Sequence, residues 1–320
     1  MKMSGVNKVI PGPRAMRMFT RVGTALALGI ACLAARAQEL EPRAYSPSPI
    51  GTGFLTVGFG RSSGGVSFDP TVPINDVHAL LYSQVVGLGQ TFGFFGRQSL
   101  ITVALPYVVG TVTGQVGEQT GSVTRSGLAD LKLRLSCNLY GVPALKPAEF
   151  AVRPHRSAVI AASISVEAPT GQYDNTKLIN LGTNRWAFKP EIGLSYPLRK
   201  FYFDVYTGAY LFGNNPHYYP GQASRTEDVL YSVQAHVSYT ILRGFWAAFD
   251  STWYGGGAVR VNDGPPAERQ SSSRLGTTLS VPLTKHHSIK LSYSSGVTAR
   301  VGANFSTLGL SWQYLWFERH

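Results

Sequence analysis

Charged residues are scarce in this sequence of 320 residues. Asp, Glu, Lys and Arg together make up 14% of it, whereas roughly 25% is usual for a soluble domain. A water-facing surface needs more charge than this, but the outer wall of a membrane barrel faces hydrocarbon and needs little. The chain is instead rich in glycine (35 residues) and in tyrosine and phenylalanine (16 each). This composition argues against an ordinary soluble domain.

Cysteine is also rare, with only Cys32 and Cys137 present. Cys32 falls in an N-terminal segment that we expect to be removed. A single remaining thiol excludes an internal disulfide and a paired-cysteine metal or redox site. The sequence also lacks the HExxH and P-loop patterns that mark many metalloproteases and nucleotide-binding enzymes. We therefore expect no cofactor, no metal site and no enzymatic activity.

Long apolar runs are missing except near the N-terminus. There, residues 1–37 contain six basic residues and no acidic one, and Val22–Ala35 is an uncharged apolar run of 14 residues. The run is too short for a spanning helix, which takes roughly 20 residues. It is followed by Ala35-Arg36-Ala37, a small-x-small pattern. This layout predicts a secretory signal peptide over residues 1–37, with residues 38–320 forming one outer-membrane barrel domain.

The positive charge of the chain comes largely from that N-terminal segment. The formal net charge is +12, with 29 basic and 17 acidic residues. Without the six basic residues of the segment, 23 basic residues remain and the net charge falls to +6. The remaining basic residues are scattered, without a basic run or a basic helix. The sequence therefore predicts no nucleic-acid partner.

From residue 52 onward the sequence alternates with a period of two, which places successive side chains on opposite faces of a sheet. We identify twelve such runs, at residues 52–60, 77–88, 99–111, 127–139, 157–168, 185–196, 200–212, 228–241, 244–255, 273–283, 287–297 and 303–316. Their length suits tilted membrane strands of roughly 9–11 residues. The pattern predicts an all-β fold, an antiparallel up-and-down transmembrane barrel of about 12 strands. Pro190 falls inside one run and cannot donate a ladder hydrogen bond, so we expect either a bulge there or a position above the membrane band.

The connections between these runs alternate in length. Short ones occur at Pro197–Arg199, Leu242–Arg243 and Thr284–His286, and long ones at residues 60–76, 112–126, 169–184, 213–227 and 256–272. Bacterial barrels have short periplasmic turns and longer extracellular loops, so both chain ends are expected on the periplasmic side. Residues 140–156 break the rule, because they form a long connection at a periplasmic position.

Alternation also assigns one face of each strand to the bore. The polar candidates for lining the lumen are Asp130, Lys132, Arg134, Glu167, Lys189, Glu191, Asp204, His236, Asp250 and Lys290. Opposite charges among them are expected to pair, because partly buried charges are rarely left alone. Some of these groups could also line a permeation path. Tyr202, Tyr206 and Tyr210 share one inward face, either as packing filler or as an aromatic surface for an apolar solute.

A more specific pattern lies in the middle of the chain. It consists of SGLADLKLRL at 126–135, EAPTGQYDN at 167–175 and NLGTNRWAFKPEIGLSYP at 180–197. These segments resemble the family of outer-membrane proteins linked to the meta-pathway of phenol degradation, which are often described simply as transporters. The resemblance implies a barrel in the outer membrane of a Gram-negative bacterium, in contact with its lipids. It also implies uptake of aromatic or other small apolar compounds.

The C-terminal stretch Thr307–Tyr314 resembles the recognition signal of outer-membrane proteins, which implies the barrel-assembly machinery as a partner. The sequence thus predicts a channel or transporter for passive uptake of small apolar or aromatic solutes. One alternative is a lipid-hydrolase-like barrel enzyme, for which the candidates are His236 between Ser232 and Ser238, and the His286-His287 pair. Another is a structural or interaction barrel. Few residues precede the first strand, so we expect any gate to be the long connection 169–184.

Overall fold

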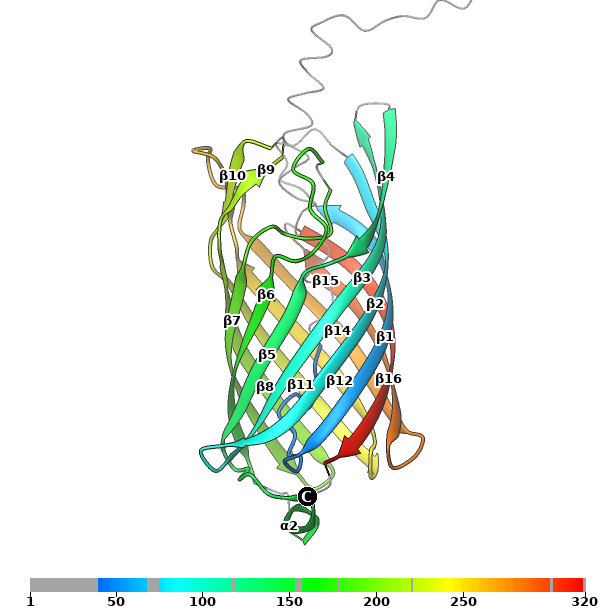
Figure 1. Cartoon of the computed structure of the whole chain (residues 1–320). Coiled ribbons are helices and arrows are strands. Elements are labelled where there is room, and N and C mark those ends of the chain that lie inside the picture. The colour runs from blue at the N-terminus through cyan, green and yellow to red at the C-terminus, as the bar shows by residue number, and fades with distance from the viewer. Residues whose placement is uncertain are drawn as a thin grey trace, which may run out of the picture.

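The computed structural model describes residues 40–67, 75–116, 119–152, 157–177, 179–219, 221–299 and 302–318. The predicted signal peptide, residues 1–37, lies outside these ranges. In the described part of the chain, no helix is long and apolar enough to cross a membrane. The strands form a tall antiparallel barrel (Figure 1).

The barrel wall has twelve strands, as the sequence predicts. In chain order its elements are β1 Thr52–Ser67, β2 Asn75–Phe94, β3 Arg97–Val116, β4 Gln119–Leu128, β5 Leu131–Tyr140, β6 Val159–Ala168, β7 Ala187–Leu198, β8 Phe201–Phe212, β11 Leu230–Leu242, β12 Phe245–Gly256, β14 Gln270–Pro282, β15 His287–Ala299 and β16 Gly302–Phe317. Each strand pairs with its neighbours in the chain. The pairing of β1 with β16, from Thr52–Phe317 to Ser67–Gly302, closes the barrel.

The elements β4 and β5 are two parts of one wall strand, since both pair with β3, one after the other. The predicted run 127–139 is therefore interrupted, at Ala129 and Asp130. Pro106 of β3 lies opposite this interruption, between the last pair with β5 (Ala104–Lys132) and the first pair with β4 (Tyr107–Leu128). Pro106 has no N–H to donate to this strand, although its carbonyl accepts from Ala129 N (2.9 Å).

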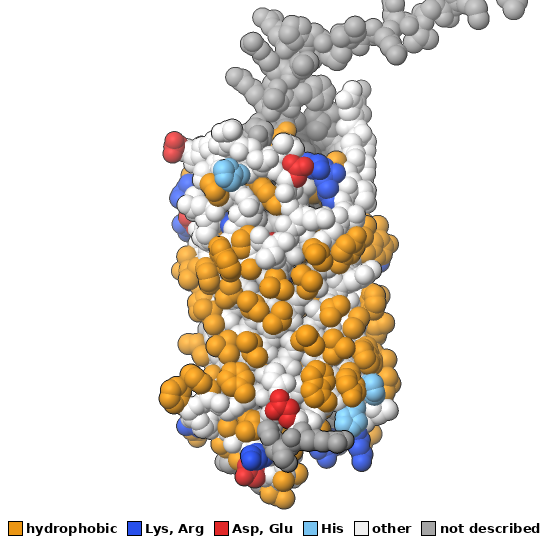
Figure 2. All heavy atoms as spheres, in the orientation of Figure 1, with side chains coloured by type: hydrophobic (Ala, Val, Ile, Leu, Met, Phe, Trp, Pro, Cys, Tyr) orange, Lys and Arg blue, Asp and Glu red, His pale blue; other side chains and the backbone are white. Residues whose placement is uncertain are grey.

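The outside of the barrel carries a belt of apolar side chains (Figure 2). Outward residues such as Val86, Ile192 and Tyr231 are more than half exposed, although such side chains are normally buried in a soluble protein. Charged side chains lie near the two ends of the visible face. A closed sheet with an apolar outer belt satisfies its backbone internally and meets hydrocarbon with its side chains. The barrel is therefore a transmembrane barrel in contact with lipid.

One end of the barrel contains several short turns and both ends of the wall, where β1 begins and β16 ends. Two-residue turns join β2 to β3, β7 to β8 and β11 to β12, and this end is the periplasmic one by the usual rule for bacterial barrels. The long connection between β5 and β6 lies here too, below the wall, and contains the short helix α2, Pro147–Val152 (Figure 1). It is held by hydrogen bonds from Ile50 N to Leu145 O (2.9 Å) and from Ala144 N to Gly96 O (3.0 Å).

The opposite end contains more strand than the sequence predicts. Residues 60–76 and 112–126 were expected to be loops, but β1 continues to Ser67 and the β3–β4 hairpin spans most of the second range. These extensions are rich in Ser, Thr and Gly, and hydroxyl pairs such as Thr111–Thr124 (2.9 Å) join the strands. Above the apolar belt neither face needs apolar residues, so no alternation marks them. The connections 213–227 and 256–272 contain a small sheet of β9 Asn215–Tyr218, β10 Ala223–Glu227 and β13 Val259–Val261.

The prediction of a bulge at Pro190 is wrong. Phe188 pairs with Leu211 and Glu191 pairs with Gly208, which is the same spacing on both strands, so no residue is inserted. Toward β6, Pro190 keeps its place opposite Ile164. The missing N–H thus interrupts the ladder to β8 locally without changing the register.

We expect Ile192→Lys to reduce the free energy of unfolding by roughly 2–4 kcal/mol, because a charge on the lipid face near the membrane centre costs about that much. Ile192 is 59% exposed and lies in the middle of β7. The measurement is denaturant unfolding in phospholipid vesicles. Thr120→Lys, in the exposed β3–β4 hairpin, is the control and should change stability by less than about 0.5 kcal/mol. Equal losses in both variants would contradict the placement of the belt.

Candidate functional site

The barrel encloses a cavity of about 270 Å³. Strands β5 to β8 supply one wall of it, with seven of the residues predicted from the sequence: Lys132, Arg134, Glu167, Lys189, Glu191, Tyr206 and Tyr210. Strands β2 and β3 supply a largely apolar wall, with Leu81, Val85, Ala104, Pro106 and Val108. The cavity is therefore amphipathic, with a polar and aromatic side and an aliphatic side.

The charged groups of the polar wall are paired with each other. Lys132 Nζ lies 3.0 Å from Glu167 Oε1, its cross-strand neighbour. Glu191 accepts from two cations, Lys189 (2.8 Å) and Arg134 (3.1 Å). Arg134 also contacts the carboxylate of Glu41, which does not belong to the wall. The wall therefore contains opposite charges in close contact.

Glu41 belongs to the stretch that precedes β1. Residues 40–51, which we call the N-terminal segment, run inside the barrel at its periplasmic half (Figure 1, blue). Main-chain hydrogen bonds from Gly51 N to Thr91 O (3.0 Å) and from Ser48 N to Gln98 Oε1 (2.8 Å) attach its end to β2 and β3. The sequence favoured the connection 169–184 as the gate, whereas the structure places this short segment in the bore.

Arg43 anchors the N-terminal segment to β8 and β11. Its main-chain N donates to Asp204 (3.2 Å), and its guanidinium donates to Ser238 and Thr240 (both 2.7 Å). The guanidinium also lies over the rings of Tyr202 (4.4 Å) and Trp246 (4.7 Å), an arrangement in which a cation meets the negative ring face. Arg43 has a φ of 63°, a left-handed conformation that is costly for a non-glycine residue. The surrounding contacts hold it there.

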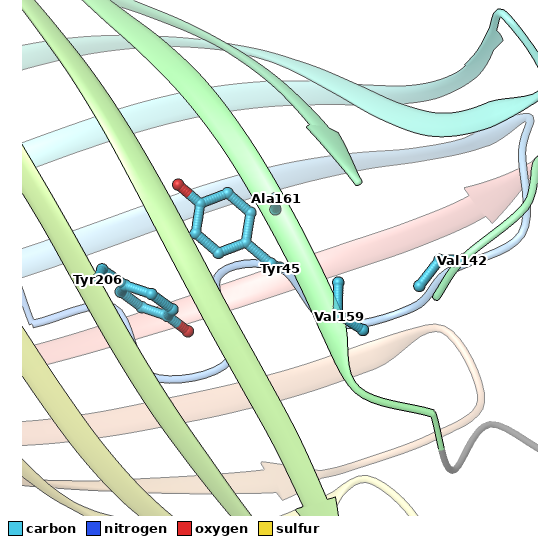
Figure 3. Packing of buried hydrophobic residues seen from close by; sticks show 5 residues of the cluster. All are labelled: Tyr45, Val142, Val159, Ala161 and Tyr206. Carbon is cyan, nitrogen blue, oxygen red and sulfur yellow. The ribbon is translucent and has the colours of Figure 1, made fainter. Parts of the chain in front are cut away.

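Tyr45 anchors the segment to β6 and β7 (Figure 3). Its hydroxyl donates to Glu191 Oε1 (2.8 Å) and lies 2.9 Å from the hydroxyl of Ser163. Its ring makes an edge contact with Tyr206, with ring centres 5.0 Å apart, and packs with Val142, Val159 and Ala161. Only 2% of Tyr45 is exposed. Burial raises its pKa to about 12, so the phenol is neutral at physiological pH and can donate its proton to Glu191.

Three predicted residues form a polar row in the bore, in register on neighbouring strands. His236 of β11 lies opposite Asp204 of β8 and Asp250 of β12. His236 Nδ1 is 2.7 Å from Asp250 Oδ1, and Asp250 Oδ2 accepts from Thr278 (2.8 Å). Asp204 accepts from Ser195 and from Arg43. All three are almost completely buried, so the row belongs to the packed interior and touches the N-terminal segment through Asp204.

The remaining predicted residues lie elsewhere. Asp130 is buried in the break between β4 and β5, where it accepts from Gly171 N (2.9 Å) and Thr183 N (2.8 Å), and it thereby attaches the connection 169–184 to the wall. Tyr202 lies against Arg43. Lys290 Nζ is 5.8 Å from the centre of the Trp246 ring. Neither Asp130 nor Lys290 lines the cavity.

The candidate catalytic residues do not assemble into a nucleophile site in the described structure. His236 Nε2 has no hydrogen-bond partner among the described residues, and the hydroxyl of Ser238 is bound by Arg43. His286 and His287 lie at the β14–β15 turn, where His286 Nδ1 is 2.9 Å from Leu315 O and His287 stacks on Trp312. Gly60–Gly64 matches the GxSxG pattern, but it lies inside β1, with Ser62 bound to Thr307. That pattern carries a nucleophile at a strand-to-helix turn.

Sequence reasoning missed Glu41, Arg43 and Tyr45 as parts of the site. Trp246 was also missed, since a tryptophan at a strand end suggests a membrane interface, yet only 9% of it is exposed and it faces Arg43. The available signal was the content of the N-terminal segment, EPRAYSPSP, which holds charged and aromatic residues beside prolines. A simple linker has little need for such a combination.

The closed wall, the apolar belt and the partly filled bore define the class: an outer-membrane-type transmembrane β-barrel. The chain belongs to the family described as "Putative MetA-pathway of phenol degradation", whose model matches residues 73–314. This finding confirms the resemblance noted in the sequence.

Solved structures support the same fold. An outer membrane channel from Pseudomonas putida F1 is 20% identical, with a TM-score of 0.73 over 87% of this chain and 100% of that one. The transport unit of the autotransporter AIDA-I from Escherichia coli is 10% identical, with a TM-score of 0.51 over 93% and 97%. The β domain of the Bordetella autotransporter BrkA is 12% identical, with a TM-score of 0.51 over 83% and 100%. No curated protein sequence matches the chain significantly.

We expect Arg43→Ala to increase the ion conductance of the barrel, because the change removes two hydrogen bonds and two ring contacts that hold the N-terminal segment in the bore. Single-channel recording in planar bilayers measures this. Arg61→Ala is the matched control, since Arg61 is exposed and, within the part of the chain that the structure describes, its guanidinium bonds only to nearby Ser63. If both variants conduct like the wild type, Arg43 does not keep the segment in place.

Proposed function

We propose that the chain is exported with a cleavable signal peptide, assembled by the barrel-assembly machinery into the outer membrane, and acts there as a channel for passive entry of small neutral aromatic compounds. The observation that carries this proposal is the amphipathic cavity inside the barrel. It offers an aliphatic wall to a ring, and tyrosines and paired charges to a polar substituent.

The charges of the cavity favour a neutral solute over an ion. Each lining carboxylate, Glu41, Glu167 and Glu191, already has a cationic partner. An ionic solute would have to break such a pair, and removing one partner of a buried pair is strongly unfavourable. A neutral ring can instead pack against Val85 and Val108 on one side and Tyr206 and Tyr210 on the other.

The size of the cavity also fits a small aromatic compound. An apolar cavity of roughly 150 Å³ can bind benzene, so about 270 Å³ accommodates a substituted ring. The family description refers to phenol degradation, and the relative from Pseudomonas putida F1 is described as an outer membrane channel. Both descriptions agree with this solute class and with passage through the barrel. The geometry around His236 gives no comparable support to the enzyme alternative, because no hydroxyl group of the described residues bonds to that ring.

The direct test is solute flux into liposomes that contain the purified, refolded barrel. We expect phenol-like aromatics to enter faster than through empty liposomes, and to be favoured over sugars of similar size, because only the aromatics match the apolar wall. Equal acceleration of both classes would indicate a general narrow pore. No flux from a folded barrel would contradict the proposal.

A variant pair tests whether the cavity is the path. Ala104 of β3 lines the cavity, whereas its neighbour Val103 faces outward. Ala104→Trp should fill the cavity and bring aromatic flux close to that of empty liposomes. Val103→Trp adds the same side chain on the lipid face and should leave flux unchanged. Equal flux through the two variants would mean that solutes do not pass through this cavity.

A further inference from the structure

The environment of Tyr45 is a binding site for a phenol, already occupied by a phenol of the protein itself. From its Cβ outward, the tyrosine side chain corresponds to para-methylphenol. Every recognition element of a phenol site is present around it: Glu191 accepts from its hydroxyl at 2.8 Å, the Ser163 hydroxyl lies at 2.9 Å, and Tyr206 contacts its ring edge to face. The Arg134 guanidinium lies 5.1 Å from the centre of the ring. We call these four residues, with Gly193, the Tyr45 site.

The Tyr45 site is shaped for a ring. Gly193 of β7 forms its floor, and a methyl group added there would overlap the Tyr45 ring and crowd the edge of the Tyr206 ring. Ala161 and Val159 of β6 close the side with small and branched groups (Figure 3). The polar side chains that form the site are rigidly placed, since Glu191 and Ser163 are buried and lie on the paired strands β7 and β6. These features belong to the wall strands, which pair with each other independently of the N-terminal segment.

The Tyr45 site is also continuous with the cavity. Arg134, Glu191 and Tyr206 belong to both. A solute that occupies the cavity therefore already touches three of the residues that bind Tyr45. Tyr45 itself is attached through a segment that has no strand pairing of its own, so the ring can leave without disrupting the wall.

We propose that the Tyr45 site is a subsite for phenolic solutes and that Tyr45 is its intramolecular ligand, which a free phenol displaces. The proposal rests on the proposed function, since it names the class of aromatic solute and the place where the barrel distinguishes it. A neutral phenol replaces the hydrogen bond to Glu191 and the ring contact with Tyr206. An aromatic hydrocarbon replaces only the ring contact and leaves the Glu191 carboxylate without that donor.

The test removes the Tyr45 side chain from the site and then adds a free phenol that can bind in its place. Tyr45→Gly removes a side chain equal to para-methylphenol, and we expect the purified variant to bind added para-methylphenol with a stoichiometry of one by titration calorimetry in detergent. Toluene has the same ring and methyl group without the hydroxyl, and it should bind at least about tenfold more weakly because the buried Glu191 carboxylate loses the hydrogen bond from the hydroxyl. Wild-type protein, whose site is filled, should bind para-methylphenol at least about tenfold more weakly than the variant.

Two further variants fix the location of binding. In Tyr45→Gly/Gly193→Ala the added methyl group takes the place of ring atoms, and para-methylphenol binding should be lost. If Tyr45→Gly does not fold, as judged by circular dichroism, Tyr45→Ala titrated with phenol repeats the test with both the ligand and the cavity smaller by one carbon. Equal binding by the single and double variants, or equal binding of toluene and para-methylphenol, would overturn the proposal.

A second readout is independent of affinity. Tyr45→Gly should conduct ions better than wild type in planar bilayers, and para-methylphenol should return its conductance toward the wild-type level. The binding experiment and the liposome flux experiment test different statements, so a negative result in one does not imply a negative result in the other. Phenol binding without aromatic flux would contradict the proposed function and leave the subsite standing. Aromatic flux without phenol binding at the Tyr45 site would contradict the subsite and leave the proposed channel function intact.

Discussion

Inside hydrocarbon, every backbone N–H and C=O group has to find a partner within the protein, and this constraint determines the rest of the structure. The chain meets it by closing a sheet, with β1 paired to β16 along the whole length of both strands. Closure assigns one face of every strand to lipid and the other to an enclosed bore. The outward face becomes the apolar belt, and the inward face carries nearly all the polar groups. Polar side chains in a narrow bore must then be satisfied by one another or by something that enters it.

The bore of this barrel uses both solutions. The wall pairs its own charges, as in Lys132–Glu167 and Lys189–Glu191, and the N-terminal segment supplies partners where the wall is incomplete. Glu41 meets Arg134, the main chain at Arg43 meets Asp204, and Tyr45 meets Glu191. The segment therefore fills space and also completes the hydrogen bonding of an interior that the strands alone leave unfinished. The same groups that accept the segment are those that a polar solute would contact from the cavity.

The wall was predictable from the sequence and the contents of the bore were not. Alternation is a local signal, so strands such as β7 and β8 are located to within two residues, and inward residues such as Glu191 and Tyr206 are assigned by phase. Where both faces are polar, as in the β3–β4 hairpin, the signal vanishes and strand looks like loop. The break at Asp130 lies opposite Pro106, and only strand pairing brings these two positions together. Tyr45 finds its acceptor 146 residues later in the chain, and no periodicity reports a contact of that kind.

The two anchors of the N-terminal segment form their side-chain hydrogen bonds with different strands, although Ala44 between them donates to the hydroxyl of Tyr206 (3.2 Å), whose ring contacts Tyr45. Arg43 is held by Asp204, Ser238 and Thr240 on β8 and β11, whereas Tyr45 is held by Ser163 and Glu191 on β6 and β7. The left-handed backbone of Arg43 costs roughly 1–2 kcal/mol, and each hydrogen bond from its charged group contributes about as much in return. A ring that competes with Tyr45 therefore has to match one phenol and its few partners, and does not have to overcome the Arg43 anchor. Selectivity for the solute can reside at Tyr45 while Arg43 keeps the segment inside the barrel.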